Sequence, residues 1–274
     1  MSSGQTLALI HPQSPWPGVQ FFCTTRAGGV GRVPFATFNL GMGVGDNVAT
    51  VAENRRRLRQ VVPAEPYWLR QVHGWRVMDA DAGVGPQSAT APGAVSTQQG
   101  VVPPEADAAI TTQPGRVLAI LTADCLPVVL ADTEGRVLGV AHAGWRGLAG
   151  GVLEATLQAM RERCPEARAW RAWIGPGIGA SAFQVGDDVR EAFAGVGAEL
   201  PGMFTADTQV TGKWRADLAG LARWRLVRLG VENIEICGLC TATDAAGRFY
   251  SYRRDGQTGR MATLAWIQAE PQSS

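Results

Sequence analysis

Three short apolar runs, separated by polar corners, form the most regular pattern in the chain. They occupy residues 117–121, 128–130 and 137–140. Runs of this length without polar alternation are typical of strands that are buried on both faces. The corner after the first run contains a thiol, Cys125, and the third run leads to an imidazole, His142, in a glycine-rich stretch. The pattern therefore predicts neighbouring core strands with chemical groups at their ends, where α/β proteins place their sites.

Similar patterns elsewhere predict further strands and four helices. Strand-like runs occupy residues 19–25, 67–73, 172–174, 234–236 and 249–252. Apolar residues three or four positions apart predict helices over residues 46–62, 150–164, 187–196 and 217–229. The glycine corner at the start of the second of these helices would present backbone N–H groups to an anion such as phosphate. We therefore expect a protein that contains both helices and strands.

Three segments depart from these patterns. Residues 1–18 are rich in Pro and Ser, and residues 81–104 are low in charge and rich in Gly, Ala, Pro, Ser and Thr. We expect the first to wrap the surface as a peripheral tail and the second to be a long mobile loop or lid. Residues 267–274 form a second peripheral tail. No domain boundary is needed to explain the loop, and we expect residues 1–274 to form one domain.

Composition narrows the class of protein. The chain has 274 residues, of which 46% are hydrophobic and 18% charged, the balance of a globular protein with a substantial core. Its 25 basic and 24 acidic residues give a net charge of +1, which favours neither nucleic acid nor a membrane surface as a partner. Five cysteines, an odd number, favour reduced thiols over a disulfide framework. With no signal peptide and no apolar run near the ~20 residues of a membrane span, we expect a soluble cytoplasmic protein.

The chain has only three histidines, and two of them follow apolar runs. His73 and His142 are each followed by small residues, whereas His11 precedes Pro12 near the amino terminus and is expected on the surface. Together with Cys125, His73 and His142 would supply three ligands to Zn²⁺ and leave a fourth position for water or substrate. A metal-free Cys–His nucleophile pair fits the same residues, and so do a buried thiol and buried histidines of the core. The spacing alone leaves these three interpretations open.

Two further groups of residues carry weaker signals. Cys237 and Cys240 form a C-x-x-C pair, but no second pair is present for a zinc ribbon and no clear helix follows for a redox motif. Five arginines lie beside glycine-rich corners rather than on helix faces: Arg26, Arg146, Arg253, Arg254 and Arg260. Arginines in such places suit bidentate binding of an anion, although ion pairs with carboxylates explain them about as well.

Short motifs along the chain are similar to those of one known family. They are TTRAGGV at residues 24–30, NLG at 39–41, QVH at 71–73, TADCLP at 122–127, AHAGWRG at 141–147 and SYRRD at 251–255. In this order, and over nearly the whole chain, they resemble the laccase-domain family, whose bacterial members are also described as YfiH-type polyphenol oxidases and as purine nucleoside phosphorylases. The ADC and HAGWRG elements together are highly specific. The resemblance implies an α+β fold, a single domain with mixed β-sheets flanked by helices.

The resemblance also implies a zinc ion bound by the QVH histidine, the ADC cysteine and the HAGWRG histidine, which are His73, Cys125 and His142. The implied activity is phosphorolysis of purine nucleosides: adenosine, inosine, guanosine or methylthioadenosine plus phosphate gives the base and a ribose 1-phosphate. Deamination of adenosine to inosine is implied as a companion activity, although the deaminase signature with its catalytic Glu is absent. The expected partners are therefore a purine nucleoside and phosphate, with a monomer as the default state.

The same resemblance suggests roles for residues around the three ligands. Arg26 and Arg146 would hold phosphate. Asp124 and Gln71, close in sequence to two of the ligands, would support them or transfer protons, and Asn39 would contact the ribose or the base. The expected catalytic residues are Cys125, His142, His73, Asp124 and Arg26. The chain departs from the family pattern at four positions that are not proposed ligands, so the wall of the pocket is expected to differ: Gly31, Gly177, Phe183 and Gln184.

Two other activities remain as alternatives. The family's older name implies a copper-dependent polyphenol oxidase, but three histidines cannot build a blue-copper centre together with a trinuclear cluster. A metal-free cysteine hydrolase would use Cys125 as the nucleophile and His142 as the base. Copper is therefore the less favoured metal, and zinc-dependent phosphorolysis is the favoured activity.

Overall fold

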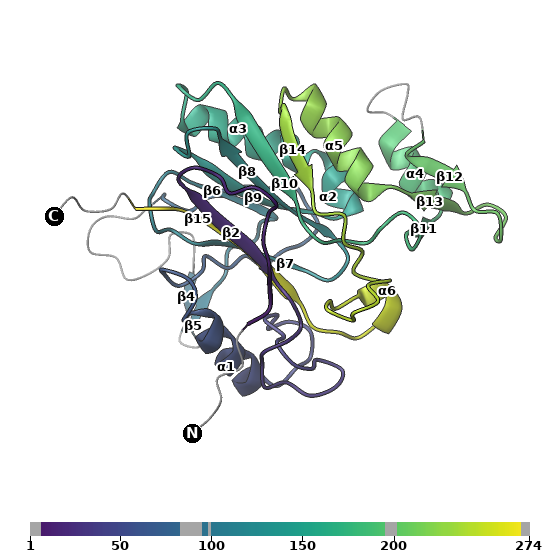
Figure 1. Cartoon of the computed structure of the whole chain (residues 1–274), viewed down its shortest axis with the longest axis horizontal. Helices are drawn as coiled ribbons and strands as arrows, with labels where there is room; N and C mark the ends of the chain where they lie inside the picture. Colours follow the sequence, from purple (N-terminus) through teal and green to yellow (C-terminus); the bar gives the residue numbers. More distant parts are fainter. Residues whose placement is uncertain (1–6, 83–94, 98–99, 195–201, 270–274) are drawn as a thin grey trace.

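Two stacked β-sheets form the middle of the molecule, and helical segments cover the outer face of each (Figure 1). The computed structural model describes residues 7–82, 95–97, 100–194 and 202–269. Apolar side chains fill three spaces in this arrangement. They lie between the larger sheet and its helices, between the two sheets, and between the smaller sheet and the region around helix α1 (Val48–Leu58).

The larger sheet has six strands and mixed pairing. Its strand order is β14 (Asn233–Ile236), β10 (Trp170–Ile174), β8 (Leu126–Asp132), β9 (Leu138–Ala143), β6 (Ala108–Thr111) and β3 (Val77–Asp79). The outermost pair at each end, β10 with β14 and β3 with β6, is parallel, and the inner pairs are antiparallel. The parallel pair β3–β6 sets the start of β3 beside the start of β6, which becomes important for the site.

The smaller sheet has four antiparallel strands, in the order β1 (Leu9–Ile10), β2 (Val19–Thr24), β15 (Met261–Ile267) and β7 (Leu118–Thr122). Two minor sheets lie outside this stack. One contains β11 (Gln184–Val185), β13 (Trp214–Ala216) and β12 (Phe204–Ala206), and the other is a hairpin of β4 (Val95–Thr97) and β5 (Gly100–Val102).

Side-chain alternation along the central strands holds the layers together. In β8, Leu126, Val128 and Leu130 face the helix layer, whereas Val129 and Ala131 face the smaller sheet. Because successive side chains of a strand point to opposite faces, one fully apolar strand supplies both layers. Each buried valine or leucine of this strand contributes roughly 1.5–3 kcal/mol relative to exposure, so the central strands are rigid supports for groups at their ends.

Helices α3 (Val152–Arg163) and α5 (Leu218–Arg228) pack on the outer face of the larger sheet, with α2 (Trp145–Gly150) and α4 (Asp187–Ala194) beside them. The last helix, α6 (Tyr252–Asp255), is a single turn that precedes β15. None of the helices in the described ranges is both long and apolar enough to cross a membrane. The mixed and antiparallel sheets with flanking helices confirm the predicted α+β fold class, and the three central apolar runs are β7, β8 and β9.

Residues 67–73 do not form the strand that their pattern predicted, and their backbone pairs with other segments only in the isolated β-bridges Tyr67–Leu118 and Arg70–Glu105. The side chain of Gln71 takes the place of a backbone partner. Its amide donates to the carbonyl of Leu121 and accepts from the N–H of the same residue, at 2.8 Å in both cases. The chain then turns at His73, whose φ of 62° lies in the left-handed region that strand residues avoid. His73 therefore lies on a loop and not at the end of a strand.

Two other predictions need correction. Residues 249–252 form no strand, because Ser251 caps α6 by accepting a hydrogen bond from the N–H of Arg254. The helix predicted over residues 150–164 begins earlier, as α2, and breaks at Gly151, whose φ of 96° ends α2 before α3 starts. The helix that begins beside His142 is thus α2, and the start of α3 lies one helix further along the chain.

The predicted tails and loop lie partly within the described residues. The amino-terminal segment contributes strand β1 to the smaller sheet, so it is more than a surface wrapping. Within the loop predicted over residues 81–104, residues 83–94 and 98–99 lie outside the described residues, while β4 and β5 pair as a hairpin. Residues 270–274 of the second tail and residues 195–196 of the third predicted helix also lie outside them.

Candidate metal centre

The two stacked sheets are joined at the corner that carries Cys125. Strand β7 of the smaller sheet ends at Thr122 and strand β8 of the larger sheet begins at Leu126, so residues 123–125 pass from one sheet to the other. Asp124 turns this corner with a φ of 101°. Because β8 pairs with β9 in the register Leu126↔Ala143, the corner lies beside the end of β9, which contains His142.

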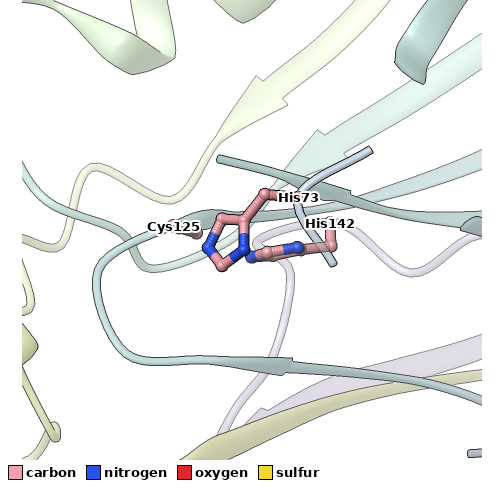
Figure 2. A group of neighbouring side chains, drawn as sticks. All are labelled: His73, Cys125 and His142. Atoms are coloured by element: carbon pink, nitrogen blue, oxygen red, sulfur yellow. The ribbon is translucent and has the colours of Figure 1, made fainter. Parts of the chain in front are cut away.

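The structure brings the three predicted ligands together. The donor atoms of His73, Cys125 and His142 all lie within 4.8 Å of one another. The two imidazole rings meet edge to face, with centroids 4.8 Å apart and planes at 71°, and Figure 2 shows the three side chains converging from separate segments. His142 is buried, Cys125 is partly buried and His73 is exposed, so the cluster is anchored in the core and open on the His73 side.

A fully buried carboxylate, Asp107, links the two histidines. It directly precedes β6, which pairs with both β3 and β9. Its oxygens accept hydrogen bonds from three successive backbone N–H groups, those of Val72 at 3.1 Å, His73 at 2.9 Å and Gly74 at 2.7 Å. The same carboxylate lies 2.8 Å from Nδ1 of His142. One side chain therefore sets both the loop that carries His73 and the ring orientation of His142.

The sequence alone did not point to Asp107. The signal was present, since a single acidic residue between alanines directly precedes the apolar residues of β6. A charged residue in that place is buried only when paired or hydrogen-bonded, but its partners lie 33 to 35 positions before it and 35 positions after it. Only the pairing of β6 with both neighbours reveals what the carboxylate does.

The charges within the cluster favour a thiolate. Burial by itself raises the pKa of the Cys125 thiol, but the imidazoles of His142 and His73 outweigh it and lower that pKa to about 6. Burial also acts on His142, where it lowers the pKa, while the Cys125 sulfur and the Asp107 carboxylate raise it to about 9. The thiolate is the form of cysteine that binds metals and attacks electrophiles.

Three glycines of the HAGWRG region leave room for the loop that carries His73. A Cβ at Gly144 would lie 2.8 Å from Sγ of Cys125, and one at Gly147 would lie 2.7 Å from the carbonyl oxygen of Gly74. A Cβ at Gly150 would meet the ring of Trp75 at 2.8 Å. These glycines recur every three residues along α2, so residues 73–75 lie along one face of that helix.

The donor set fits zinc. Two imidazoles and one thiolate are typical zinc ligands, and three protein ligands leave one coordination position open. Tetrahedral zinc with bonds of about 2.0–2.3 Å places its ligand atoms roughly 3.3–3.8 Å apart, which small side-chain rotations reach from the observed cluster. Asp107 occupies Nδ1 of His142 and leaves Nε2 for the metal, the arrangement in which a carboxylate orients a ligating histidine.

Asp124 and Gln71, expected near the ligands, both make framework contacts. One carboxylate oxygen of Asp124 accepts from the hydroxyl of Thr241 at 2.6 Å, and the other accepts from the N–H of Arg253 at 2.7 Å. Asp124 thereby ties the segments around α6 to the Cys125 corner. Gln71, as described above, uses both ends of its amide on the backbone of Leu121.

Asn39, expected to contact the ribose or the base, is fully buried. Its Oδ1 accepts from the N–H groups of Gly41 and Arg260, at 2.9 Å each, and its Nδ2 donates to the carboxylate of Asp46 at 2.9 Å. All of these partners belong to the protein. The structure therefore places Asn39 where it holds the loop of residues 39–46 against the start of β15.

The two arginines expected to hold phosphate differ in their surroundings. Arg26 is half-buried at the end of β2, where its Nε donates to the carbonyl of Ala36 at 2.8 Å and its guanidinium lies 5.0 Å from the centre of the Tyr250 ring. Arg146 is exposed in the first turn of α2 and stacks on Trp145 at 4.3 Å. Neither forms an ion pair with a carboxylate in the described part of the chain.

The four positions that depart from the family pattern lie in three places. Gly177 is close to the Cys125 corner, where a Cβ would meet the Leu126 side chain at 2.5 Å and the carbonyl of Asp124 at 3.1 Å. Gly31 lies apart from the cluster, and its N–H donates to Thr37. Phe183 and Gln184 lie beside β11, where Phe183 packs under the guanidinium of Arg253 and Gln184 donates to Asp207.

Known proteins resemble this chain over almost all of its length. The profile of the family described as multi-copper polyphenol oxidoreductase laccase matches residues 20–268. A purine nucleoside phosphorylase of Xylella fastidiosa is 47% identical over 267 residues, which cover 94% of this chain and 96% of that protein. The purine nucleoside phosphorylase YfiH of Escherichia coli is 43% identical and covers 94% of this chain and 98% of its own.

A crystal structure agrees with these relatives. A Neisseria meningitidis protein superposes with a TM-score of 0.82 at 38% sequence identity, covering 95% of this chain and 99% of that chain. The resemblance inferred from the motifs is thus confirmed, and the curated relatives, which are named as enzymes, support an enzyme here too. The chain belongs to the laccase-domain family of YfiH-type proteins.

Proposed function

We propose that the protein is a zinc-dependent purine nucleoside phosphorylase. It would convert adenosine, inosine, guanosine or methylthioadenosine and phosphate to the base and a ribose 1-phosphate, and deaminate adenosine as a companion activity. The observation that carries this proposal is the cluster of His73, Cys125 and His142, tied together by Asp107. The relatives named purine nucleoside phosphorylase support the choice of reaction.

His73, Cys125 and His142 would hold the zinc ion through two imidazole nitrogens and one thiolate sulfur. When bound, zinc supplies a Lewis acid with an open position for a phosphate oxygen or a water molecule. Asp107 keeps His142 in the tautomer that has Nε2 free, and it keeps His73 on its side of the cluster. Because His73 is the exposed member, the substrate would approach from its side.

The surrounding arginines would bind the anionic co-substrate. Arg26 and Arg146 have no carboxylate partner in the described residues, so their guanidinium groups remain available to phosphate oxygens. Charge-assisted, bidentate hydrogen bonds suit this geometry. We propose that Asn39 and Gln71 act by holding the backbone around the site, because their amide groups are committed to protein partners.

Deamination of adenosine needs a proton carrier. Asp124 is the carboxylate next to Cys125, and a carboxylate that accepts two hydrogen bonds keeps further lone pairs for a proton. We therefore propose Asp124 for this role in the companion reaction, in addition to its contacts with Thr241 and Arg253.

A metal-free cysteine hydrolase is the second candidate, and one observation favours it. The lowered pKa of Cys125 and the raised pKa of His142 describe a thiolate–imidazolium pair of the kind that attacks carbonyl groups, since each partner favours the charged form of the other over the effect of burial. A copper oxidase has less support, because the cluster supplies two histidines and the chain has only one more, His11, which packs against Phe22 in the smaller sheet.

The test is hypoxanthine release from inosine, with and without phosphate, by protein whose metal content has been determined. Phosphate-dependent release by protein with about one zinc per chain supports the phosphorylase, and Cys125→Ala should then lose both zinc and turnover. Retention of zinc and full phosphorolysis by Cys125→Ala would contradict the proposal. Absence of release from a metal-free protein that hydrolyses acyl substrates, and that a thiol reagent inactivates, would favour the cysteine hydrolase.

A further inference from the structure

Arg260 lies at the junction of the two sheets, next to the proposed metal centre. It directly precedes β15, which runs antiparallel to β7 with Met261 opposite Thr122. Extending this register by one residue brings Arg260 beside Ala123, within the corner that carries Cys125. Figure 1 shows the chain running from α6 into β15.

The backbone around Arg260 is fixed by the motif residues that surround it. Its N–H donates to Oδ1 of the buried Asn39 at 2.9 Å, and its carbonyl accepts from the N–H of Leu40 at 3.2 Å. A Cβ at Gly41 would lie 2.8 Å from Cγ of Arg260, so only a glycine lets the arginine stem pack at that place. The NLG motif thus holds Arg260 in position.

The guanidinium of Arg260 has no carboxylate partner among the described residues, unlike those of Arg248 and Arg254. Arg254 pairs with Asp255 at 2.6 Å, and Arg248 pairs with Asp244 at 2.5 Å. Arg260 instead donates through Nη1 to two carbonyl groups of its own segment, at 3.0 and 2.9 Å. Its Nε and Nη2 donate to no group in the described part of the protein.

The electrostatic neighbours of Arg260 belong to the site. Burial lowers the pKa of its guanidinium, and the opposing influences come from Cys125, Asp124 and the hydroxyl of Tyr252, an exposed side chain at the start of α6. Asp124 forms no ion pair with Arg260 in the described residues, and its two oxygens accept from Thr241 and the backbone of Arg253. A half-buried cation without a paired anion is costly, and an incoming anion would relieve that cost.

We propose that Arg260 binds the phosphate co-substrate beside the proposed metal centre. This inference rests on the proposed phosphorylase function and adds a residue to it. The register of β15 with β7 places Arg260 next to the Cys125 corner, and its unused Nε and Nη2 form one edge of a planar fork. That edge matches two oxygens of a tetrahedral oxyanion.

The test compares Arg260→Gln and Arg260→Lys with the unaltered protein. Arg171→Gln is the matched control, because Arg171 is also half-buried and bonded to a backbone carbonyl, that of Thr133, but lies at the opposite end of the larger sheet. The measurements are steady-state KM for phosphate and for inosine, zinc content, and direct binding of inorganic phosphate by calorimetry to zinc-loaded and zinc-free protein.

Arg260→Gln should raise KM for phosphate by about tenfold or more, as loss of a charge-assisted hydrogen bond does, while KM for inosine stays within about twofold. Calorimetric affinity for phosphate should fall in parallel, zinc content should not change, Arg260→Lys should recover part of the loss, and Arg171→Gln should match the unaltered protein. Unchanged phosphate affinity in both Arg260 variants would overturn the inference, and so would loss of zinc from the better-folded of them.

Failure of the proposed function has a different signature. If the unaltered protein releases no base from inosine, the phosphorylase reaction itself is wrong. The calorimetric experiment still decides the role of Arg260 in that case, because it measures inorganic phosphate directly and needs no turnover.

Discussion

The two halves of the proposed metal centre are built in different ways. Cys125 and His142 lie on or beside the paired strands β8 and β9, where backbone hydrogen bonds of the sheet set their positions. His73 lies on a loop with a φ of 62°, in which side chains replace the missing strand partners: Asp107 binds three N–H groups and Gln71 binds the backbone of Leu121. The first half is a product of sheet pairing, and the second depends on individual side chains.

The difference has an energetic meaning. A strand-borne ligand shares its support with many ladder hydrogen bonds and buried apolar contacts, so single substitutions remove only part of that support. A loop residue in the left-handed region carries about 1–3 kcal/mol of backbone strain, and the contacts around the loop must offset this strain. We therefore expect the metal affinity of the centre to be most sensitive to changes at the few groups that hold the loop.

The largest effect is expected from Asp107→Asn, which replaces an acceptor of four hydrogen bonds with an amide whose NH₂ faces N–H donors. Zinc affinity should fall by about 10–100-fold, and the free energy of unfolding should fall by about 3–5 kcal/mol, as when one partner of a buried ion pair is removed. Competitive chelation measures the first quantity and urea unfolding the second.

The matched control for Asp107→Asn is Asp132→Asn. Asp132 is equally buried and accepts from the N–H groups of Arg136 and Val137 and from Nε of Arg136, but in the turn between β8 and β9 at the far end of the sheet. The Asp132→Asn variant should have a lower free energy of unfolding and an unchanged zinc affinity. Equal loss of zinc affinity in both variants would show that Asp107 contributes only to folding.

A smaller effect is expected from Gly147→Ala, because its Cβ would lie 2.7 Å from the carbonyl oxygen of Gly74. The loop must move, at a cost of about 1–3 kcal/mol. Zinc affinity should fall by about tenfold, the lower end of the range expected for Asp107→Asn. Gly150→Ala is the control on the same face of α2, since its Cβ meets only the ring of the exposed Trp75. Gly150→Ala should keep full zinc affinity. An equal loss of zinc affinity in Gly150→Ala and Gly147→Ala would contradict the role given to the contact with Gly74.

The smallest effect is expected from Gln71→Ala, which removes two hydrogen bonds to Leu121 without disturbing Asp107. Unfolding should become easier by about 1–3 kcal/mol, with a few-fold change in zinc affinity and no change in the coordination geometry. Thermal unfolding of zinc-loaded and zinc-free protein measures the change in stability and the change in zinc affinity. A loss of zinc affinity larger than that of Asp107→Asn would reverse the ranking of the two loop supports.

The same contrast explains what the sequence could predict. Apolar runs identified β7, β8 and β9, and their polar ends pointed to Cys125 and His142, because strand burial leaves a local signal. The segment of His73 was predicted as a strand since its apolar residues imitate one, whereas its true partners are the side chains of Gln71 and Asp107. Those contacts join residues that are 34 and 50 positions apart, and no local pattern reports them.

The arginines are a second case in which the local sequence does not identify the contacts of a side chain. Their placement beside glycine corners indicated anion binding or ion pairing, and the sequence offered no way to separate the two. The structure separates them for Arg254, which pairs with Asp255, and for Arg260, which has only carbonyl partners in the described residues. Whether an arginine has a carboxylate beside it depends on sheet register and loop packing.

The most direct test of the central claim is X-ray absorption at the zinc edge of the purified, zinc-loaded protein. A centre held by His73, Cys125 and His142 predicts two imidazole nitrogens at about 2.0–2.1 Å and a single sulfur at about 2.3 Å, with one lighter atom in the open position. The sulfur scatterer should disappear in Cys125→Ala. A zinc shell made only of nitrogen and oxygen in the unaltered protein would contradict the account.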